Sequence, residues 1–149
     1  LLLEIKKNTD LELKISSILD IGTGSGILSI MSSRIFSCKV TGIDNDAEAI
    51  FQAKSNLKIN SLTSSIEFML SELDEVRGKF DLIIINISYE YIYSKFEILS
   101  SRFNDSVFIL SGFLSDSFPN LNRLFIVKKF SIIYMIYHDN WITVALKRI

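Results

Sequence analysis

Apolar residues along the chain fall into short runs that alternate with segments of helical spacing. Runs typical of β-strands occupy 17–20, 39–44 and 66–70, where apolar and β-branched residues gather. Between them, 27–35 and 47–58 carry apolar residues three or four positions apart, the spacing of an amphipathic helix. Strands that alternate with helices of this length predict βαβ units and therefore a parallel sheet.

The second half of the chain continues this alternation. Residues 81–87 are apolar at nearly every position, as a central parallel strand requires because both of its faces are covered. A helix is expected at 89–99, a strand at 107–111 and a short helix at 116–124. Pro119 fits this last helix because proline is tolerated in the first turn.

The last two strand-like runs, 130–137 and 141–147, are separated by only three residues. Such a connection is too short for a helical crossover but suits an antiparallel hairpin. The sequence therefore predicts an α/β fold with a seven-stranded sheet that is mostly parallel and ends in a C-terminal antiparallel hairpin. Because no linker-like or repeated segment divides the chain, we expect one domain over residues 1–149.

Composition narrows the class of protein. With 16 basic and 17 acidic side chains, the formal net charge is -1, which gives no signal for a nucleic-acid partner and disfavours a polyanionic one. The single cysteine can form no internal disulfide, and no metal site is expected. No apolar run has the length of a membrane helix, and the start lacks a signal-peptide pattern. We expect a cytoplasmic monomer, and a fragment of a longer protein because the chain begins without Met.

The strongest local signal is a buried strand that runs into Gly22, Gly24 and Gly26 and then opens a helix. Glycine allows positive φ and close approach of a ligand. The spacing is one residue shorter than the dinucleotide fingerprint, which places a pyrophosphate at the helix start. Asp20 instead puts an anion before the loop, where it could meet the cationic amino-acid part of S-adenosylmethionine directly or through water. The alternative is a glycine turn selected only for tight packing.

Two more polar residues end predicted strands, at the edge where open α/β sheets bind ligands. Asp44 lies some twenty residues past the loop, and its carboxylate could accept hydrogen bonds from ribose hydroxyls. Its alternative role is to cap the next helix, for which Asn45 and Asp46 are better placed. Asn86 carries an amide that could accept from an amine and donate to a cofactor. A buried, satisfied asparagine or a turn residue is its alternative reading.

These motifs resemble the catalytic domain of the ribosomal protein L-eleven methyltransferases, which methylate lysine and N-terminal amines of a large-subunit ribosomal protein. The resemblance covers nearly the whole chain. It is carried by 19–28, by 42–47 with Asn56, by Asp81 with 86–87, by 110–114 and by Trp141.

The resemblance implies a Rossmann-like methyltransferase sheet, a ribosomal protein as acceptor, and contact of Gly22, Asp44 and Asn86 with S-adenosylmethionine. Asn86 is also the catalytic candidate, because its amide could orient the acceptor amine. The resemblance also leads us to expect that the family's N-terminal domain, which recruits the ribosomal protein, is not part of this chain. The cofactor-binding candidates are Asp20, Gly22, Thr23, Gly24, Gly26, Asp44, Asn45 and Asn86.

Other functions stay open at this point. The acceptor could be a small molecule or RNA, the chain could be a non-catalytic S-adenosylmethionine-binding module, and a nicotinamide-dependent oxidoreductase is disfavoured by the short glycine spacing and the hairpin. The small residues usual after the Asn-Ile pair are replaced in this chain by residues 88–91. Tyr89, Tyr91 and Tyr93 could line an acceptor pocket, but they fall on different faces of a helix, so packing is expected for at least two of them. His138 is expected to be a hairpin residue, and 128–129 to be solvated surface.

Overall fold

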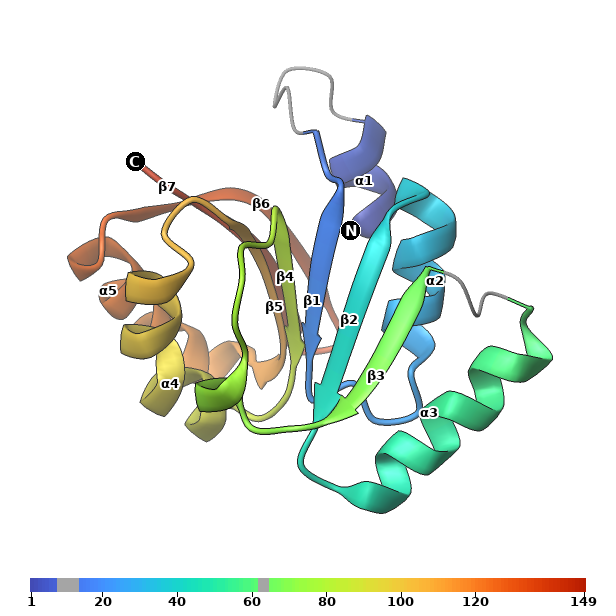
Figure 1. Cartoon of the computed structure of the whole chain (residues 1–149). Coiled ribbons are helices and arrows are strands. Elements are labelled where there is room, and N and C mark those ends of the chain that lie inside the picture. Colours follow the sequence, from blue (N-terminus) through green and yellow to red (C-terminus); the bar gives the residue numbers. More distant parts are fainter. Residues whose placement is uncertain (8–13, 62–64) are drawn as a thin grey trace. The chain divides into compact units, whose positions relative to one another are not determined.

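The computed structural model describes residues 1–7, 14–61 and 65–149 (Figure 1). The chain divides into two compact units, Leu2–Ile84 and Ile85–Ile149, the second with Leu1. No helix within the described ranges is both long and apolar enough to cross a membrane. The elements are α1 (Leu2–Lys7), β1 (Ser17–Ile21), α2 (Ile27–Phe36), β2 (Lys39–Asp44), α3 (Ala47–Ile59), β3 (Ile66–Leu70), η2 (Leu73–Glu75), β4 (Leu82–Asn86), α4 (Tyr89–Arg102), β5 (Val107–Leu114), η3 (Ser115–Ser117), α5 (Phe118–Val127), β6 (Phe130–His138) and β7 (Trp141–Arg148).

The strands form a seven-stranded sheet in the order β3-β2-β1-β4-β5-β7-β6. β1 pairs with β2 and β2 with β3 in parallel, whereas β7 pairs with both β5 and β6 in antiparallel. The prediction of an α/β fold with a mostly parallel sheet and a C-terminal antiparallel hairpin is therefore confirmed.

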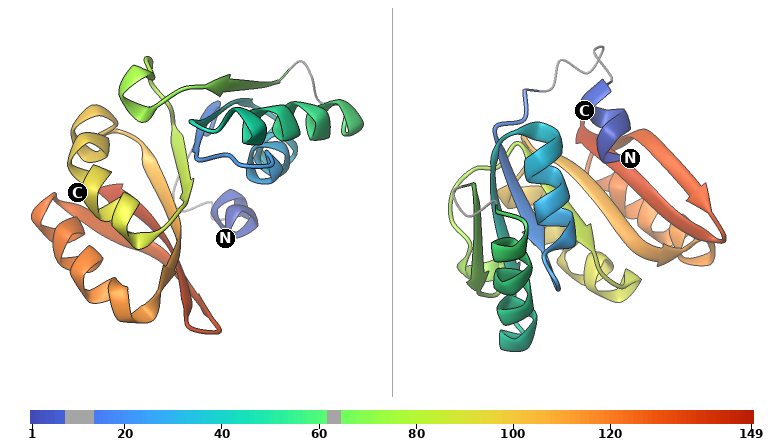
Figure 2. Two further views of the ribbon diagram at one scale, coloured as in Figure 1. Left: turned by 90° about the horizontal axis from the view of Figure 1, so that it is seen from below. Right: turned by 90° about the vertical axis from the view of Figure 1, so that its right-hand side faces the viewer.

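In the first unit, α2 and α3 lie on the same side of β1, β2 and β3 (Figure 2). β1 is covered on both faces, and Ile18 and Leu19 are completely buried. The start of β1 is fixed by Asp81, whose Oδ2 accepts hydrogen bonds from the backbone N–H and the hydroxyl of both Ser16 and Ser17. These bonds hold the strand that leads into the glycine loop.

In the second unit, four buried phenyl rings join α4 and α5 to the sheet. The ring of Phe96 in α4 lies 4.9 Å from Phe125 in α5, 6.1 Å from Phe108 in β5 and 5.5 Å from Phe130 in β6, centroid to centroid. Aromatic pairs at such distances add to the free energy gained by burying apolar area. We call these four residues the phenyl cluster; it defines the face of β5, β6 and β7 that α4 and α5 cover.

β5 contains an irregularity that the sequence pattern does not reveal. Its register with β7 shifts between Leu110 and Phe113, and Gly112 has φ +89°. A Cβ built on Gly112 would lie 2.4 Å from the carbonyl oxygen of Ile87. The close approach of these two backbones fixes the turn that follows Asn86, which explains why glycine stands at this position of β5.

The element bounds differ from the predicted ones mainly at carboxyl ends. β5 continues to Leu114 instead of 111, and α4 to Arg102 instead of 99. The predicted helix at 116–124 is a 3₁₀ turn followed by α5, with Pro119 in the first turn of α5 as expected. η2 was not predicted, because its pattern is a reciprocal capping box rather than a periodicity.

Candidate functional site

The loop after β1 is a tight turn held by backbone hydrogen bonds. Gly22, Gly24 and Gly26 have φ of 68°, 55° and 80°. The N–H groups of Gly22 and Thr23 both donate to the carbonyl of Ile43 in β2, each at 2.9 Å. Positive φ at three of five residues makes glycine the residue that forms this turn without strain.

Asp20 is buried beneath this loop and fastens it to α2. Its Oδ2 accepts hydrogen bonds from the hydroxyls of Thr23 at 2.7 Å and Ser29 at 2.6 Å. Burial raises the pKa of Asp20, because it outweighs these hydrogen bonds, which lower the pKa. The side chain is only 1% exposed, so its clearest function in this structure is to hold the loop against the first turn of α2.

The inner side of the loop is packed and the outer side is open. A Cβ on Gly26 would lie 2.6 Å from the ring of Phe68, and one on Gly42 would lie 2.6 Å from the same ring. By contrast, a Cβ on Gly24 would meet nothing within 4 Å. Packing therefore explains the glycines at 26 and 42, but not the one at 24. Gly24 leaves bare backbone facing open space, which a ligand can approach closely.

Asp44 lies at the carboxyl end of β2, next to the loop. Its Oδ2 accepts from the N–H of Gly24 at 2.9 Å, and its Oδ1 from the N–H of Asp46 at 3.0 Å. A carboxylate has about four acceptor positions, so each oxygen keeps one for a further donor. The side chain is half-buried, which leaves it accessible to a ligand that lies over Gly24.

The neighbours of Asp44 take separate roles. Of the two residues that the sequence favoured as the cap of α3, Asp46 takes this role by accepting from the N–H of Glu48. Asn45 is exposed, and its amide donates to Glu72 at 2.9 Å. The amide of Asn56, in α3, donates to the carbonyl of Ser25 in the glycine loop. Asn56 and Ser29 are therefore loop-supporting residues whose roles the sequence did not show, because neither belongs to the glycine pattern: Ser29 lies in α2 and Asn56 in α3.

Asn86 belongs to the second unit, where it ends β4 and is exposed. The reading of this residue as a buried, satisfied asparagine is therefore wrong. α4 begins three residues later, and the rings of Tyr89 and Tyr93 lie 5.5 Å apart on one face of it. The other predicted cofactor residues, from Asp20 to Gly26 and at 44–45, lie in the first unit.

The hairpin between β6 and β7 explains His138. Its Nδ1 lies 3.2 Å from a carboxylate oxygen of Asp139, and both side chains are exposed. Among the described residues, no group of three or more His, Cys, Asp or Glu side chains is placed to hold a metal ion. His138 is a hairpin residue, as predicted.

Because the pKa of Asp20 is raised, we expect its contribution to the free energy of unfolding to depend on pH. Because the folded-state pKa lies above its ordinary value of 3.8, the contribution of Asp20 to the free energy of unfolding is complete below that value and is lost as pH rises through the folded pKa. Asn at position 20 keeps an oxygen acceptor for Thr23 and Ser29 but does not titrate. Urea unfolding of both proteins across this range should show Asp20→Asn gaining stability relative to the unsubstituted chain as pH rises. If the free energies of unfolding of the two proteins changed in parallel with pH, the pKa of Asp20 would not be raised in the folded state.

Comparison with known proteins shows which protein family the chain resembles. A family model described as "Ribosomal protein L11 methyltransferase (PrmA)" matches residues 3–149. A relative named ribosomal protein L11 methyltransferase, from Bacillus licheniformis, is 31% identical over 134 residues, which are 89% of this chain and 43% of the relative. Another of the same name, from Thermosipho africanus, is 37% identical over 113 residues, 74% of this chain and 43% of the relative. The chain thus spans less than half the length of these relatives.

A solved structure agrees with these relatives. The crystal structure of a ribosomal protein L11 methylase from Lactobacillus delbrueckii subsp. bulgaricus matches with a TM-score of 0.86 at 29% sequence identity. The match covers 99% of this chain and 76% of that one.

Proposed function

Because the chain belongs to the ribosomal protein L11 methyltransferase family, we propose that it binds S-adenosylmethionine and that the whole protein methylates amines of a ribosomal protein. The observation that carries the proposal is the pairing of Gly24 with Asp44. Gly24 exposes its backbone to open space. Asp44 accepts a hydrogen bond from that backbone and keeps free acceptor positions. This arrangement fits a nucleoside whose ribose hydroxyls donate to a carboxylate.

The remaining residues of the loop fit this cofactor. Gly22 and Thr23 form the turn, and the buried side chain of Asp20 holds it from behind. The glycine spacing, one residue shorter than the dinucleotide fingerprint, argues against a pyrophosphate at the start of α2. Direct contact of Asp20 with the cofactor remains a prediction, as does contact by Asn45, whose amide already donates to Glu72.

When bound, the cofactor supplies a methyl group on a positively charged sulfur. The task of the protein is then to hold a neutral amine in line with that methyl group and to keep water out. Asn86 can serve this task, since its amide oxygen can accept a hydrogen bond from the amine and so direct the nitrogen lone pair. No residue is assigned as general base. The expectations of a cytoplasmic location, a monomer and a single domain stay predictions.

Calorimetry of this chain tests the cofactor assignment. Adenosylhomocysteine should bind and NAD should not, because the loop suits an amino-acid nucleoside without a pyrophosphate. Binding without methyl transfer, even in a protein extended to the length of the relatives, would leave a cofactor-binding module. Preferential binding of NAD would overturn the proposal.

Asn86→Ala should lower the rate of methyl transfer at least tenfold, equivalent to about 1.4 kcal/mol of barrier, with a smaller change in adenosylhomocysteine affinity. The amide is expected to position the amine more than to hold the cofactor. Single-turnover kinetics on ribosomal protein L11 with the full-length enzyme would measure this change, with Asn122→Ala in α5 as a matched control. Normal turnover by a folded Asn86→Ala protein would show that the amine is positioned by other groups.

A further inference from the structure

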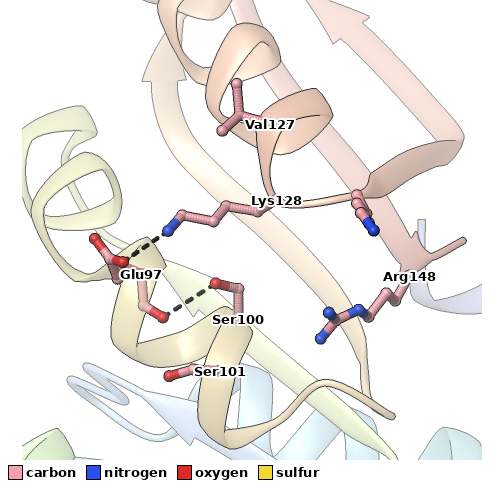
Figure 3. A pocket seen from close by; sticks show the side chains of 7 residues that line it. Glu97, Ser100, Ser101, Val127, Lys128 and Arg148 are labelled. Atoms are coloured by element: carbon pink, nitrogen blue, oxygen red, sulfur yellow. Dashed lines mark hydrogen bonds and ion pairs between the residues drawn. The ribbon is translucent and has the colours of Figure 1, made fainter.

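The second unit contains a cationic pocket that none of the candidate cofactor-binding residues lines (Figure 3). It has a volume of about 380 Å³ and lies where the end of α4, the turn between α5 and β6, and the end of β7 meet. α4 begins three residues after Asn86 and reaches the pocket eight to twelve residues later, roughly 12–18 Å along the helix. The residues that line the pocket are Glu97, Ser100, Ser101, Val127, Lys128, Lys129 and Arg148.

The register of the hairpin brings two of the cations together from distant parts of the sequence. Arg148 is opposite Phe130, so both lie on the face of the sheet that carries the phenyl cluster, and Arg148 lines the pocket. The N–H of Ile149 donates to the carbonyl of Lys129 at 2.9 Å. The first residue before β6 and the last residue of β7 are therefore fixed side by side at the mouth of the pocket.

The charge of the pocket is not balanced. Lys128 is half-buried and its ammonium lies 2.8 Å from Glu97, which lowers the pKa of that carboxyl group. Within the described ranges, no side-chain hydrogen bond or ion pair joins Lys129 or Arg148 to a carboxylate. Three cations face one carboxylate, a local charge of +2 in a chain whose formal net charge is -1. The expectation that 128–129 are merely solvated surface is therefore too simple.

A second hollow of about 290 Å³ adjoins this pocket and shares Arg148 with it. It adds the cation Lys147 and the carboxylate Asp105, so the excess of positive charge is the same over both hollows. Attraction to the carboxyl end of α5 accounts for a cation at 128, directly after the helix. It does not account for Arg148 and Lys147, which come from the end of a strand.

We propose that this pocket binds phosphate groups of an RNA backbone. The planar guanidinium of Arg148 can donate two parallel hydrogen bonds to a phosphate, and Lys129 adds an ammonium beside it. The protons of Ser100 and Ser101 are engaged with carbonyls of α4, so the donors are the cations. Two open hollows that share one arginine suit the successive phosphates of a chain better than a single free phosphate. The proposal does not depend on the methyltransferase assignment.

The test is binding of a fluorescent single-stranded RNA of about 12 nucleotides to the whole chain, measured by anisotropy as salt is raised from about 50 mM. The double variant Lys129→Gln with Arg148→Gln should weaken binding about tenfold at low salt. It should also reduce the slope of log affinity against log salt by about 1.4, for two lost contacts to a single strand.

The matched control removes two exposed lysines elsewhere, Lys54→Gln with Lys58→Gln in α3, and so makes the same change in net charge. This control should leave the RNA affinity at low salt, and the slope of log affinity against log salt, nearly unchanged. Equal losses in both double variants would show general attraction by net charge and would overturn the proposal. Unchanged RNA binding by the double variant at 129 and 148 would also overturn the proposal. Inorganic phosphate that binds the pocket by NMR titration, without any measurable RNA binding, would overturn the assignment to RNA.

Discussion

Gly112→Ala should destabilise the chain by about 3–5 kcal/mol, one of the largest effects that a single methyl group can have here. The new Cβ would lie 2.4 Å from the carbonyl oxygen of Ile87 and 2.9 Å from its carbonyl carbon and nitrogen. These are backbone atoms, which cannot move aside by a change of rotamer. In addition, φ of +89° is a conformation that L side chains rarely adopt.

Gly78 provides the matched control, because it separates backbone strain from collision. Its φ is +104°, but a Cβ there would meet nothing within 4 Å. Gly78→Ala should therefore cost only the strain, about 1–2 kcal/mol. Urea unfolding of both variants measures the difference. Equal losses of stability would mean that Ile87 moves freely, and the close packing of β5 on the turn after Asn86 would then not be what fixes that turn.

The alternation of strands and helices could be predicted because the spacing of apolar residues within each element shows which of its faces is buried. The run at 81–87 is apolar except at Asp81 and Asn86, and β4 is buried at four of its five positions. The three residues between the last two strands likewise predicted the hairpin. The shift of register in β5 could not be predicted in this way, since Gly112 interrupts no periodicity and its reason lies in the backbone of Ile87.

In the candidate site, too, some residues could be recognised from the local sequence, whereas the contacts that hold them could not. The glycine loop, Asp20 and Asp44 were identified from the sequence because each follows or ends a strand. The hydroxyl of Ser29 that binds Asp20 lies in α2, and the ring of Phe68 that excludes a side chain at Gly26 lies in β3. Such partners are visible only when the chain has folded, because their spacing in sequence carries no pattern.

Asp44→Ala should weaken the binding of adenosylhomocysteine by about 10- to 150-fold, which corresponds to the 1.5–3 kcal/mol of charge-assisted hydrogen bonds. Two causes contribute. The variant loses the acceptor positions proposed for the ribose hydroxyls, and it releases the N–H of Gly24, which Asp44 holds at 2.9 Å. Calorimetry of the folded variant measures the change in affinity.

Asp46→Ala is the control for this experiment, because it removes a carboxylate of the same kind two residues away. Asp46 caps α3 through the N–H of Glu48, and no hydrogen bond of its side chain to the glycine loop is found among the described residues. Its loss should lower the free energy of unfolding by about 1 kcal/mol and leave adenosylhomocysteine affinity within about twofold. Asp44→Asn distinguishes the two causes at Asp44, since the amide oxygen can still accept from Gly24 but carries no charge for the ribose. An unchanged affinity in Asp44→Ala would show that the ribose binds elsewhere, whereas a loss in Asp44→Ala that Asn fully restores would assign Asp44 to the loop alone.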